Sequence, residues 1–119
     1  MLILVAHGSP NPSWRASVER MSQLVGERAG DVPVRLAYME CTPPTLMEIA
    51  TEAVEAGVTR IRVLPLFLAD EGHVERNVKP LVDEVRTAHG TLAIELLPSL
   101  GHHRQFREFL VAVARDDNY

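Results

Sequence analysis

The sequence predicts an α/β fold, a three-layer sandwich in which helices flank a four-stranded parallel sheet. Four short apolar runs alternate with four longer segments whose apolar residues recur at helical spacing. Glycine or proline lies between most of these segments and marks the loops. Strands that alternate with helices in this way form right-handed βαβ units with parallel strands, as in flavodoxin-like and Rossmann-like topologies. We expect residues 1–119 to form a single domain.

In the first half of the chain, the apolar run 2–6 predicts a buried strand, and residues 13–28 predict a helix. A second strand is expected over residues 32–39. Thr42 and the two prolines after it predict the start of the second helix, with Thr42 as the N-cap and proline in the first turn. The first helix has an apolar face of the kind that packs on a core, formed by Trp14, Val18, Met21 and Val25.

The second half of the chain repeats the alternation. Residues 60–68 predict a strand that ends or bends at Pro65, because proline cannot donate to the hydrogen-bond ladder. A third helix is expected from residue 73 or 74 to residue 89, where Gly90 stops it. The fourth strand is expected over residues 91–97 and the last helix over residues 103–115.

Composition excludes several classes of protein. The net charge is −4, from 12 basic and 16 acidic residues without a basic block, so the chain lacks the basic footprint of a nucleic-acid-binding protein. Cys41 is the only cysteine, which excludes an internal disulfide and a cysteine-rich zinc site. Neither a signal peptide nor a membrane span is recognisable, so we expect a cytoplasmic protein with no membrane partner.

Polar and ionisable residues follow the predicted strands. The carboxyl ends of parallel strands meet at one edge of a sheet, where ligands bind in open α/β folds. Two imidazoles and a carboxylate at such an edge suit a first-row divalent metal, and the same groups can also accept protons. The sequence places His7 after the first strand, Glu40 after the second, Asp70, Glu71, Gly72 and His73 after the third, and Ser99, His102 and His103 after the fourth.

Each of these residues also has a structural interpretation. His7 could be a buried histidine that is hydrogen-bonded to a backbone carbonyl. His73 could form hydrogen bonds with local groups in the first turn of a helix. Glu40 could lie near the N-terminus of the second helix, where a carboxylate interacts favourably with the helix dipole. For His7 and His73 we favour the functional interpretation. Asp70 and Glu71 fit a solvated loop, and His102 and His103 fit a surface or a helix start.

Several segments, in this order, together resemble the short form of the CbiX/SirB family, the class II sirohydrochlorin chelatases. The resemblance covers nearly the whole chain. It is carried by Leu4-Val5-Ala6-His7-Gly8-Ser9, Pro12 with Trp14, Leu36-Ala37-Tyr38-Met39-Glu40, Val63-Leu64-Pro65-Leu66-Phe67-Leu68 and Gly72-His73-Val74.

The resemblance implies insertion of a divalent metal into sirohydrochlorin, a tetrapyrrole, without ATP and without a tightly bound cofactor. Three metals are implied as alternatives: cobalt for cobalamin, iron for sirohaem, and nickel. The metal substrate is then Co²⁺, Fe²⁺ or Ni²⁺. His7 and His73 correspond to the metal-binding and catalytic pair, Glu40 to an associated glutamate, and the short form works as a homodimer. Candidate substrate contacts at this edge are Ser9, Arg15, Leu68, Gly72 and Arg76, with Lys79 and Arg104 as further cations.

One departure and two competing hypotheses accompany this resemblance. Relatives usually have an acidic residue where this chain has Asn77. A phosphotransfer histidine would fit His7 after a first strand, but that chemistry needs an adjacent arginine and the chain has Ala6. A non-catalytic carrier of metal or tetrapyrrole would use the same edge, and it would bind cobalt without accelerating its insertion.

Overall fold

The computed structural model describes residues 1–69 and 72–118, so the predicted acidic loop residues Asp70 and Glu71 lie outside the described residues, as does Tyr119. The strands are β1 (Leu2–Ala6), β2 (Val34–Tyr38), β3 (Arg60–Pro65) and β4 (Ala93–Leu96). The α-helices are α1 (Pro12–Arg28), α2 (Leu46–Glu55), α3 (Lys79–Ala88) and α4 (Arg104–Ala114), with a π-helical turn η1 (Val74–Val78) and a 3₁₀ turn η2 (Leu100–His102). No helix in the described ranges is both long and apolar enough to cross a bilayer.

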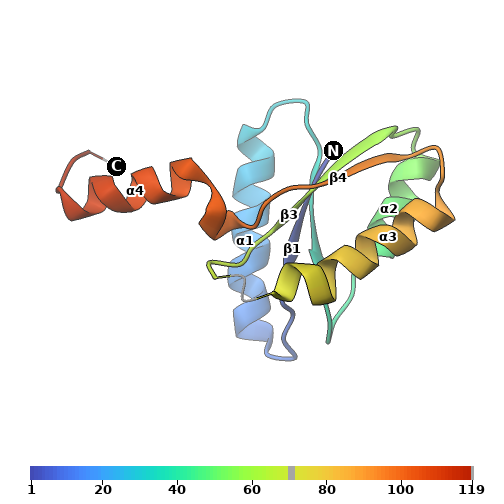
Figure 1. Cartoon of the computed structure of the whole chain (residues 1–119), viewed down its shortest axis with the longest axis horizontal. Helices are drawn as coiled ribbons and strands as arrows, with labels where there is room; N and C mark the ends of the chain where they lie inside the picture. Colours follow the sequence, from blue (N-terminus) through green and yellow to red (C-terminus); the bar gives the residue numbers. More distant parts are fainter. Residues whose placement is uncertain (70–71, 119) are drawn as a thin grey trace.

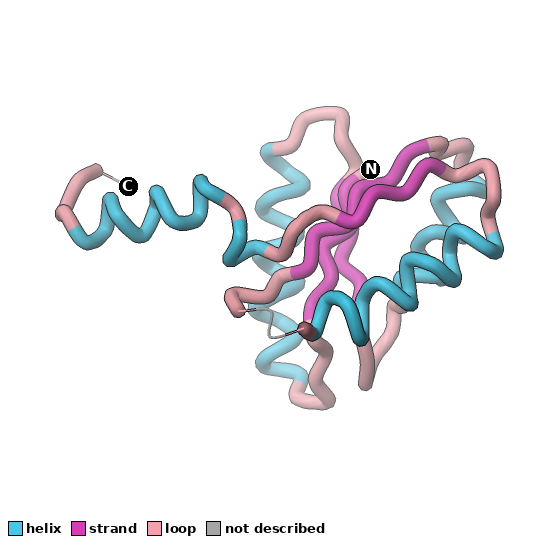
Figure 2. The backbone as a smooth tube through the Cα atoms, in the orientation of Figure 1, coloured by secondary structure: helices cyan, strands magenta, loops and turns pink. Residues whose placement is uncertain are grey.

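The four strands form one parallel sheet in the order β2-β1-β3-β4. The predicted parallel α/β architecture is confirmed, and the strand order is the flavodoxin-like one. After β1, the chain adds β2 on one side of β1 and then β3 on the other side, so β1 and β3 flank a topological switch point. Open α/β sheets bind ligands at the carboxyl ends of the strands beside such a point. Helices α2 and α3 lie on one side of the sheet and α1 on the other, whereas α4 extends away from it (Figures 1 and 2).

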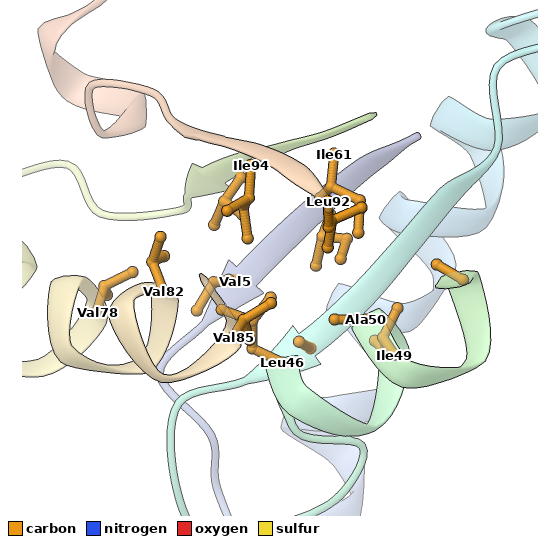
Figure 3. Packing of buried hydrophobic residues seen from close by; sticks show 14 of the residues in the cluster. Val5, Leu46, Ile49, Ala50, Ile61, Val78, Val82, Val85, Leu92 and Ile94 are labelled. Atoms are coloured by element: carbon orange, nitrogen blue, oxygen red, sulfur yellow. The ribbon is translucent and has the colours of Figure 1, made fainter. Parts of the chain in front are cut away.

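The main core lies between the sheet and helices α2 and α3 (Figure 3). Alternate residues of the strands face it, as the two-residue period of a strand requires. The helices add apolar stripes at spacings of three and four residues. The fully buried side chains of this core include Ile3, Val5, Ile49, Ile61, Val63, Val78, Val82 and Val85.

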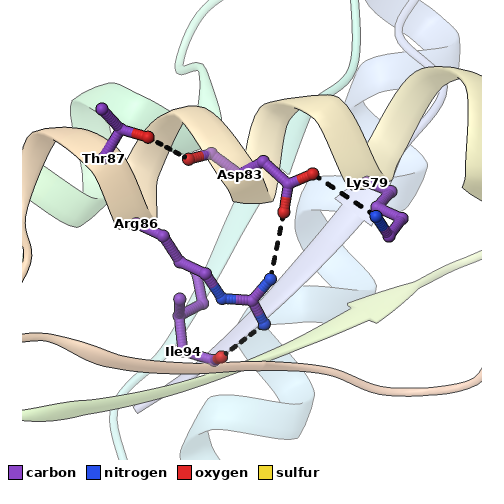
Figure 4. A network of polar contacts seen from close by, with 5 residues as sticks. All are labelled: Lys79, Asp83, Arg86, Thr87 and Ile94. Carbon is purple, nitrogen blue, oxygen red and sulfur yellow. Dashed lines mark hydrogen bonds and ion pairs between the residues drawn. The ribbon is translucent and has the colours of Figure 1, made fainter.

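A small polar network fixes α3 against β4 (Figure 4). The Arg86 guanidinium donates to the Asp83 carboxylate at 3.1 Å and to the Ile94 carbonyl at 2.9 Å. Lys79 lies 3.5 Å from the same carboxylate, one helical turn earlier. The bond to Ile94 joins helix and strand directly, and it sets the position of the helix that continues from η1.

Helix α2 begins later than the sequence analysis predicted. Thr45, not Thr42, is the N-cap: its hydroxyl accepts from the Glu48 N–H at 3.1 Å, and the Glu48 carboxylate accepts from the Thr45 N–H at 3.2 Å. This reciprocal pair is a capping box. Thr42 and Pro43 each precede a proline, and such residues avoid the helical region. The helix therefore starts only after both prolines.

The predicted inward face of α1 is wrong. Ser22 is the buried residue of this helix, and Gly26 lies against the sheet, where an added Cβ would be 3.7 Å from Val34. Trp14, Met21 and Val25 remain 38–42% exposed. Small side chains let α1 approach β2 closely, so the helix is turned with its large apolar residues toward the surface.

Strand β3 ends at Pro65, as predicted, so residues 66–68 belong to the loop after the strand. The third predicted helix is present as η1 followed by α3, and it begins with a π-helical turn at Val74. The last helix begins at Arg104 with His103 as its N-cap residue, close to the predicted start.

Tyr38 at the end of β2 gives a prediction for stability at high pH. Its side chain is 2% exposed, and its hydroxyl donates to the Glu19 carboxylate at 3.1 Å. Burial, followed by the hydrogen bond and the charge of Glu19, raises the pKa of Tyr38 from 10.0 to about 12. Between these values the unfolded chain releases the proton and the folded chain keeps it, so the free energy of unfolding falls as the pH rises.

Tyr38→Phe removes this titration. Urea denaturation at pH 9, 10 and 11 should therefore show a smaller loss of stability for Tyr38→Phe than for the wild type, although the variant starts less stable because it lacks the hydrogen bond. Parallel curves for the two proteins over this pH range would contradict the assignment.

Candidate metal and substrate site

Three side chains meet at the switch point between β1 and β3. His7 directly follows β1, Phe67 lies in the loop after β3, and His73 directly precedes η1. The ring centres of His7 and His73 are 6.1 Å apart, those of His7 and Phe67 are 6.1 Å apart, and those of Phe67 and His73 are 6.2 Å apart. The three rings thus form a nearly equilateral triangle in which Phe67 packs against both imidazoles.

Glu40 contacts His7 from the end of β2. Its carboxylate oxygen Oε1 lies 3.3 Å from Nδ1 of His7, and the Glu40 N–H donates to the His7 carbonyl at 3.2 Å. Both side chains are about half exposed, at 50% and 53%. When Nδ1 of His7 carries the proton beside this carboxylate, Nε2 is the imidazole nitrogen with a free lone pair. The pair can therefore present Nε2 as a ligand nitrogen.

Gly8 allows this close approach of the first two strand ends. Its φ is +103°, a conformation that favours glycine, and a Cβ at this position would collide with the Glu40 carbonyl oxygen. The Arg15 guanidinium holds the same loop by donating to the Ser9 carbonyl at 3.0 Å. The loop conformation thus sets the contact between His7 and Glu40.

Gly8→Ala should therefore destabilise the protein by about 1–3 kcal/mol, through a strained backbone and a displaced Glu40. Gly90→Ala is the matched control, because a Cβ at Gly90 meets no atom within 4 Å. Urea denaturation of the two variants measures the difference. Equal stability of Gly8→Ala and Gly90→Ala would rule out the close approach.

His73 enters the site from a different local structure. Gly72 before it has a φ of +84°, and η1 after it is a π-helical turn, a feature found frequently at functional sites. Nδ1 of His73 is buried and has no hydrogen-bond partner among the described residues. An unsatisfied buried nitrogen costs free energy. A bound ion or substrate group that contacts Nδ1 itself would relieve that cost.

The two imidazoles have a spacing that suits one shared metal ion. A ring centre lies roughly 3 Å from a metal bound at a ring nitrogen, so two rings on one ion have centres about 5 to 6.5 Å apart. The observed 6.1 Å falls within this range. In residues 1–69 and 72–118, no group of three or more His, Cys, Asp or Glu side chains converges closely enough to hold a metal. Among the described residues, the two imidazoles are therefore the candidate metal ligands at this edge.

The remaining candidates are distributed around this centre. Ser9 and Arg15 lie on the loop after β1, and the Ser9 hydroxyl accepts from the Asn11 N–H at 3.1 Å. Leu68 is 65% exposed. The Arg76 guanidinium lies over Gly72, within 4 Å of the position that a Cβ there would take.

Other residues considered in the sequence have local roles. Lys79 is paired with Asp83 on α3, and Arg104 begins α4. Asn77 is exposed within η1. His103 bonds the Pro98 carbonyl at 2.6 Å, a structural contact of the kind expected for it, and His89 bonds Thr51 at 3.0 Å away from the site.

Phe67 is the residue whose contribution the sequence analysis missed. It was predicted as part of the strand over residues 60–68, and in the structure it lies in the loop after β3 and packs on the core. Its simultaneous contact with His7 and His73 was not predicted. The available signal was Pro65, because a strand that ends there leaves Phe67 in the loop beside the other strand ends.

Comparison with known proteins identifies the family of this chain. The family model described as CbiX matches residues 1–117. The chain belongs to the CbiX family. Among its relatives, a sirohydrochlorin cobaltochelatase from Methanopyrus kandleri is 36% identical over 81 residues, which are 68% of this chain and 57% of that protein. A sirohydrochlorin cobaltochelatase from Methanosarcina barkeri is 30% identical over 94 residues, 79% of this chain and 72% of that protein.

Solved structures with the same fold include members of this family. A putative cobalamin biosynthesis CbiX protein from Marinobacter aquaeolei VT8 superposes with a TM-score of 0.81 at 28% identity, covering 97% of this chain and 93% of the other. The sirohydrochlorin chelatase SirB from Bacillus subtilis subspecies spizizenii, in complex with cobalt, gives a TM-score of 0.80 at 18% identity. That match covers 97% of this chain and 49% of SirB.

Proposed function

We propose that this protein is a sirohydrochlorin metal chelatase, a lyase-type enzyme that inserts a divalent metal into sirohydrochlorin without ATP. Cobalt is the preferred candidate, with Fe²⁺ and Ni²⁺ as alternatives. The observation that carries the proposal is the pair of imidazoles 6.1 Å apart at the switch point, with Glu40 at 3.3 Å from one of them. The relatives from Methanopyrus kandleri and Methanosarcina barkeri are named cobaltochelatases, and these names support cobalt. The matches cover 57% and 72% of those two proteins.

In the proposed reaction, His7 and His73 hold the incoming metal as a substrate. Neutral imidazole suits cobalt, iron and nickel, and a two-ligand site leaves coordination positions open for the nitrogens of the macrocycle. Glu40 orients His7 through Nδ1, and Phe67 limits the rotation of both rings. Loose, oriented coordination lets the ion pass from protein to substrate.

Metal insertion also requires proton removal. The free macrocycle must lose two N–H protons as one divalent cation enters, so the site needs acceptors beside the metal. One of the histidines or Glu40 is suited to this role, because all three are at the same edge of the sheet and the Glu40 side chain is 53% exposed. The protons can then pass to solvent.

The carboxylates of sirohydrochlorin need cationic or N–H partners. We propose Arg76 and Arg15 for this role, with Ser9 and Gly72 lining the approach and the exposed side chain of Leu68 against the macrocycle. We further propose that residues 1–119 act as one chelatase-like domain in the cytoplasm, in cobalamin or sirohaem biosynthesis. A homodimer is proposed as the working form, by resemblance to short family members.

The test is a spectroscopic assay of metal insertion. Purified protein is incubated with sirohydrochlorin and Co²⁺, Fe²⁺ or Ni²⁺ in turn, and initial rates are compared with a protein-free control. We expect acceleration with at least one metal, and the largest with Co²⁺. Binding of cobalt without any acceleration would indicate a carrier and would overturn the proposal.

A further inference from the structure

Phe67 lies just beyond the part of its loop that the sheet supports. The hydrogen-bond ladder to β1 continues one residue past β3, with the Leu66 N–H donating to the Val5 carbonyl at 2.8 Å. Phe67 is the next residue, yet its ring centre is 6.1 Å from that of His7 and 6.2 Å from that of His73. A loop residue keeps such a position only if another part of the chain fixes it.

The turn η2, which follows β4, supplies this support. The Gly101 N–H donates to the Phe67 carbonyl at 3.0 Å, and Figure 1 shows the turn beside the loop after β3. A Cβ at Gly101 would collide with the carbonyl oxygen of Leu68, so the two backbones are in direct contact. Phe67 and Leu68 are thus held by two adjacent contacts with one residue of η2.

Glycine is required at position 101 by the space available and not by the backbone conformation. The φ of Gly101 is outside the positive range in which Gly8 and Gly72 lie. An alanine at position 101 therefore avoids the backbone strain expected for an alanine at Gly8. Its methyl group would instead push residues 67 and 68 away from η2. A substitution at Gly101 thus acts on one neighbour, the loop that carries Phe67.

The turn itself is fixed to the sheet. The Leu97 N–H donates to the Val63 carbonyl at 2.8 Å, which continues the ladder between β3 and β4 as far as the turn. At the other end of the turn, the His103 imidazole bonds the Pro98 carbonyl at 2.6 Å. The turn is therefore a firm support, and the loop after β3 has to absorb a change at Gly101.

We propose that Gly101 is a positioning residue of the metal site: its contacts with Phe67 and Leu68 set how Phe67 holds the two imidazoles, and hence how tightly the pair binds a divalent metal. This inference rests on the proposed function and adds a residue that acts through another. The contacts run from Gly101 to Phe67 and from Phe67 to His7 and His73, so a displacement of the loop reaches both imidazoles at once. Residues that orient metal ligands in this way affect metal affinity.

The test is a double-mutant cycle on cobalt affinity. The wild type, Gly101→Ala, Phe67→Ala and the double variant are titrated with Co²⁺, and binding is followed by the visible absorption of the bound ion. We expect each single substitution to weaken binding about 10-fold, as the loss of a residue that orients a metal ligand does. Because Gly101 acts through Phe67, the double variant should also be about 10-fold weaker, whereas independent effects would multiply to about 100-fold.

Gly90→Ala is the matched control for Gly101→Ala. A Cβ at Gly90 meets no atom within 4 Å, so this variant should keep the wild-type cobalt affinity. Urea denaturation establishes that each variant is folded, and a merely structural role of Gly101 would lower stability without weakening cobalt binding. Multiplying losses in the double variant, or wild-type affinity in folded Gly101→Ala, would overturn the inference.

Phe67→Leu is a second variant that leaves η2 unchanged. It keeps an apolar side chain on the core and removes the ring that contacts both imidazoles. Its cobalt affinity should fall about 10-fold, as in Phe67→Ala. Wild-type affinity in a folded Phe67→Leu protein would overturn the inference even where Gly101→Ala does not fold.

Metal insertion on the same samples separates this inference from the proposed function. A wild type that shows the expected cycle but does not accelerate cobalt insertion supports the positioning role and contradicts the chelatase. A wild type that accelerates insertion, with multiplying losses of affinity in the cycle, contradicts the positioning role and leaves the chelatase standing. A wild type that binds no cobalt would also overturn the inference.

Discussion

His7→Ala and His73→Ala should each reduce cobalt insertion into sirohydrochlorin to the rate of the protein-free reaction. Each substitution leaves a single imidazole in place of the pair whose ring centres are 6.1 Å apart. One imidazole cannot hold the ion in a defined position beside the macrocycle, and positioning accounts for much of the acceleration that such a site provides. We expect a loss of at least about 100-fold in initial rate.

His89→Ala is the control for these two variants. His89 bonds Thr51 on the far side of the fold, so its loss should leave the insertion rate close to that of the wild type. Circular dichroism and urea denaturation establish that each variant is folded. A folded His7→Ala or His73→Ala protein with wild-type rates would remove that histidine from the proposed site.

Glu40→Gln should slow cobalt insertion by about 10- to 100-fold, the usual effect of removing a carboxylate that orients a ligand histidine. The carboxylate lies 3.3 Å from Nδ1 of His7 and supplies the only charge in that contact when the imidazole is neutral. The neutral amide holds the ring less firmly. We therefore expect the cobalt concentration for half-maximal rate to rise more than the corresponding sirohydrochlorin concentration.

The matched control for this variant is Glu84→Gln. Glu84 is exposed on α3, and its loss removes the same charge without touching His7. Steady-state rates with each substrate varied in turn make the comparison. An unchanged dependence on cobalt in Glu40→Gln would show that Glu40 does not act through His7.

The edge that holds the site could be predicted from the sequence for a physical reason. In a parallel sheet, every strand ends at the same edge, so locating β1, β2 and β3 was enough to bring His7, Glu40 and His73 together. The prediction did not need contacts between distant residues. It needed only the strand ends, and those are marked by glycine, proline and a change from apolar to polar residues.

Details that depend on close approach could not be predicted in this way. The contact between His7 and Glu40 exists because Gly8 lets two loops touch, and a glycine in a sequence does not name the backbone that approaches it. The start of α2 was misplaced because Thr42 and Thr45 both fit an N-cap. The capping box with Glu48 decides between them.

The error on α1 has a different cause. The apolar stripe from Trp14 to Val25 predicts a buried face, but the sequence does not say what buries it. Within one chain, Ser22 and Gly26 face the sheet and the stripe stays exposed. The same holds for Leu110 and Val113 on α4. Helical periodicity thus indicates an apolar face, and it does not say which surface covers that face.

The most direct test of the proposed metal site is to locate cobalt itself. Crystals grown without metal and then soaked in Co²⁺ give an anomalous difference map at the cobalt edge. The proposal predicts a peak between the ring nitrogens of His7 and His73, at about 2.0–2.2 Å from one nitrogen of each. The peak should weaken in crystals of His73→Ala. Cobalt bound elsewhere, with both imidazoles vacant in a protein that accelerates insertion, would contradict the proposal.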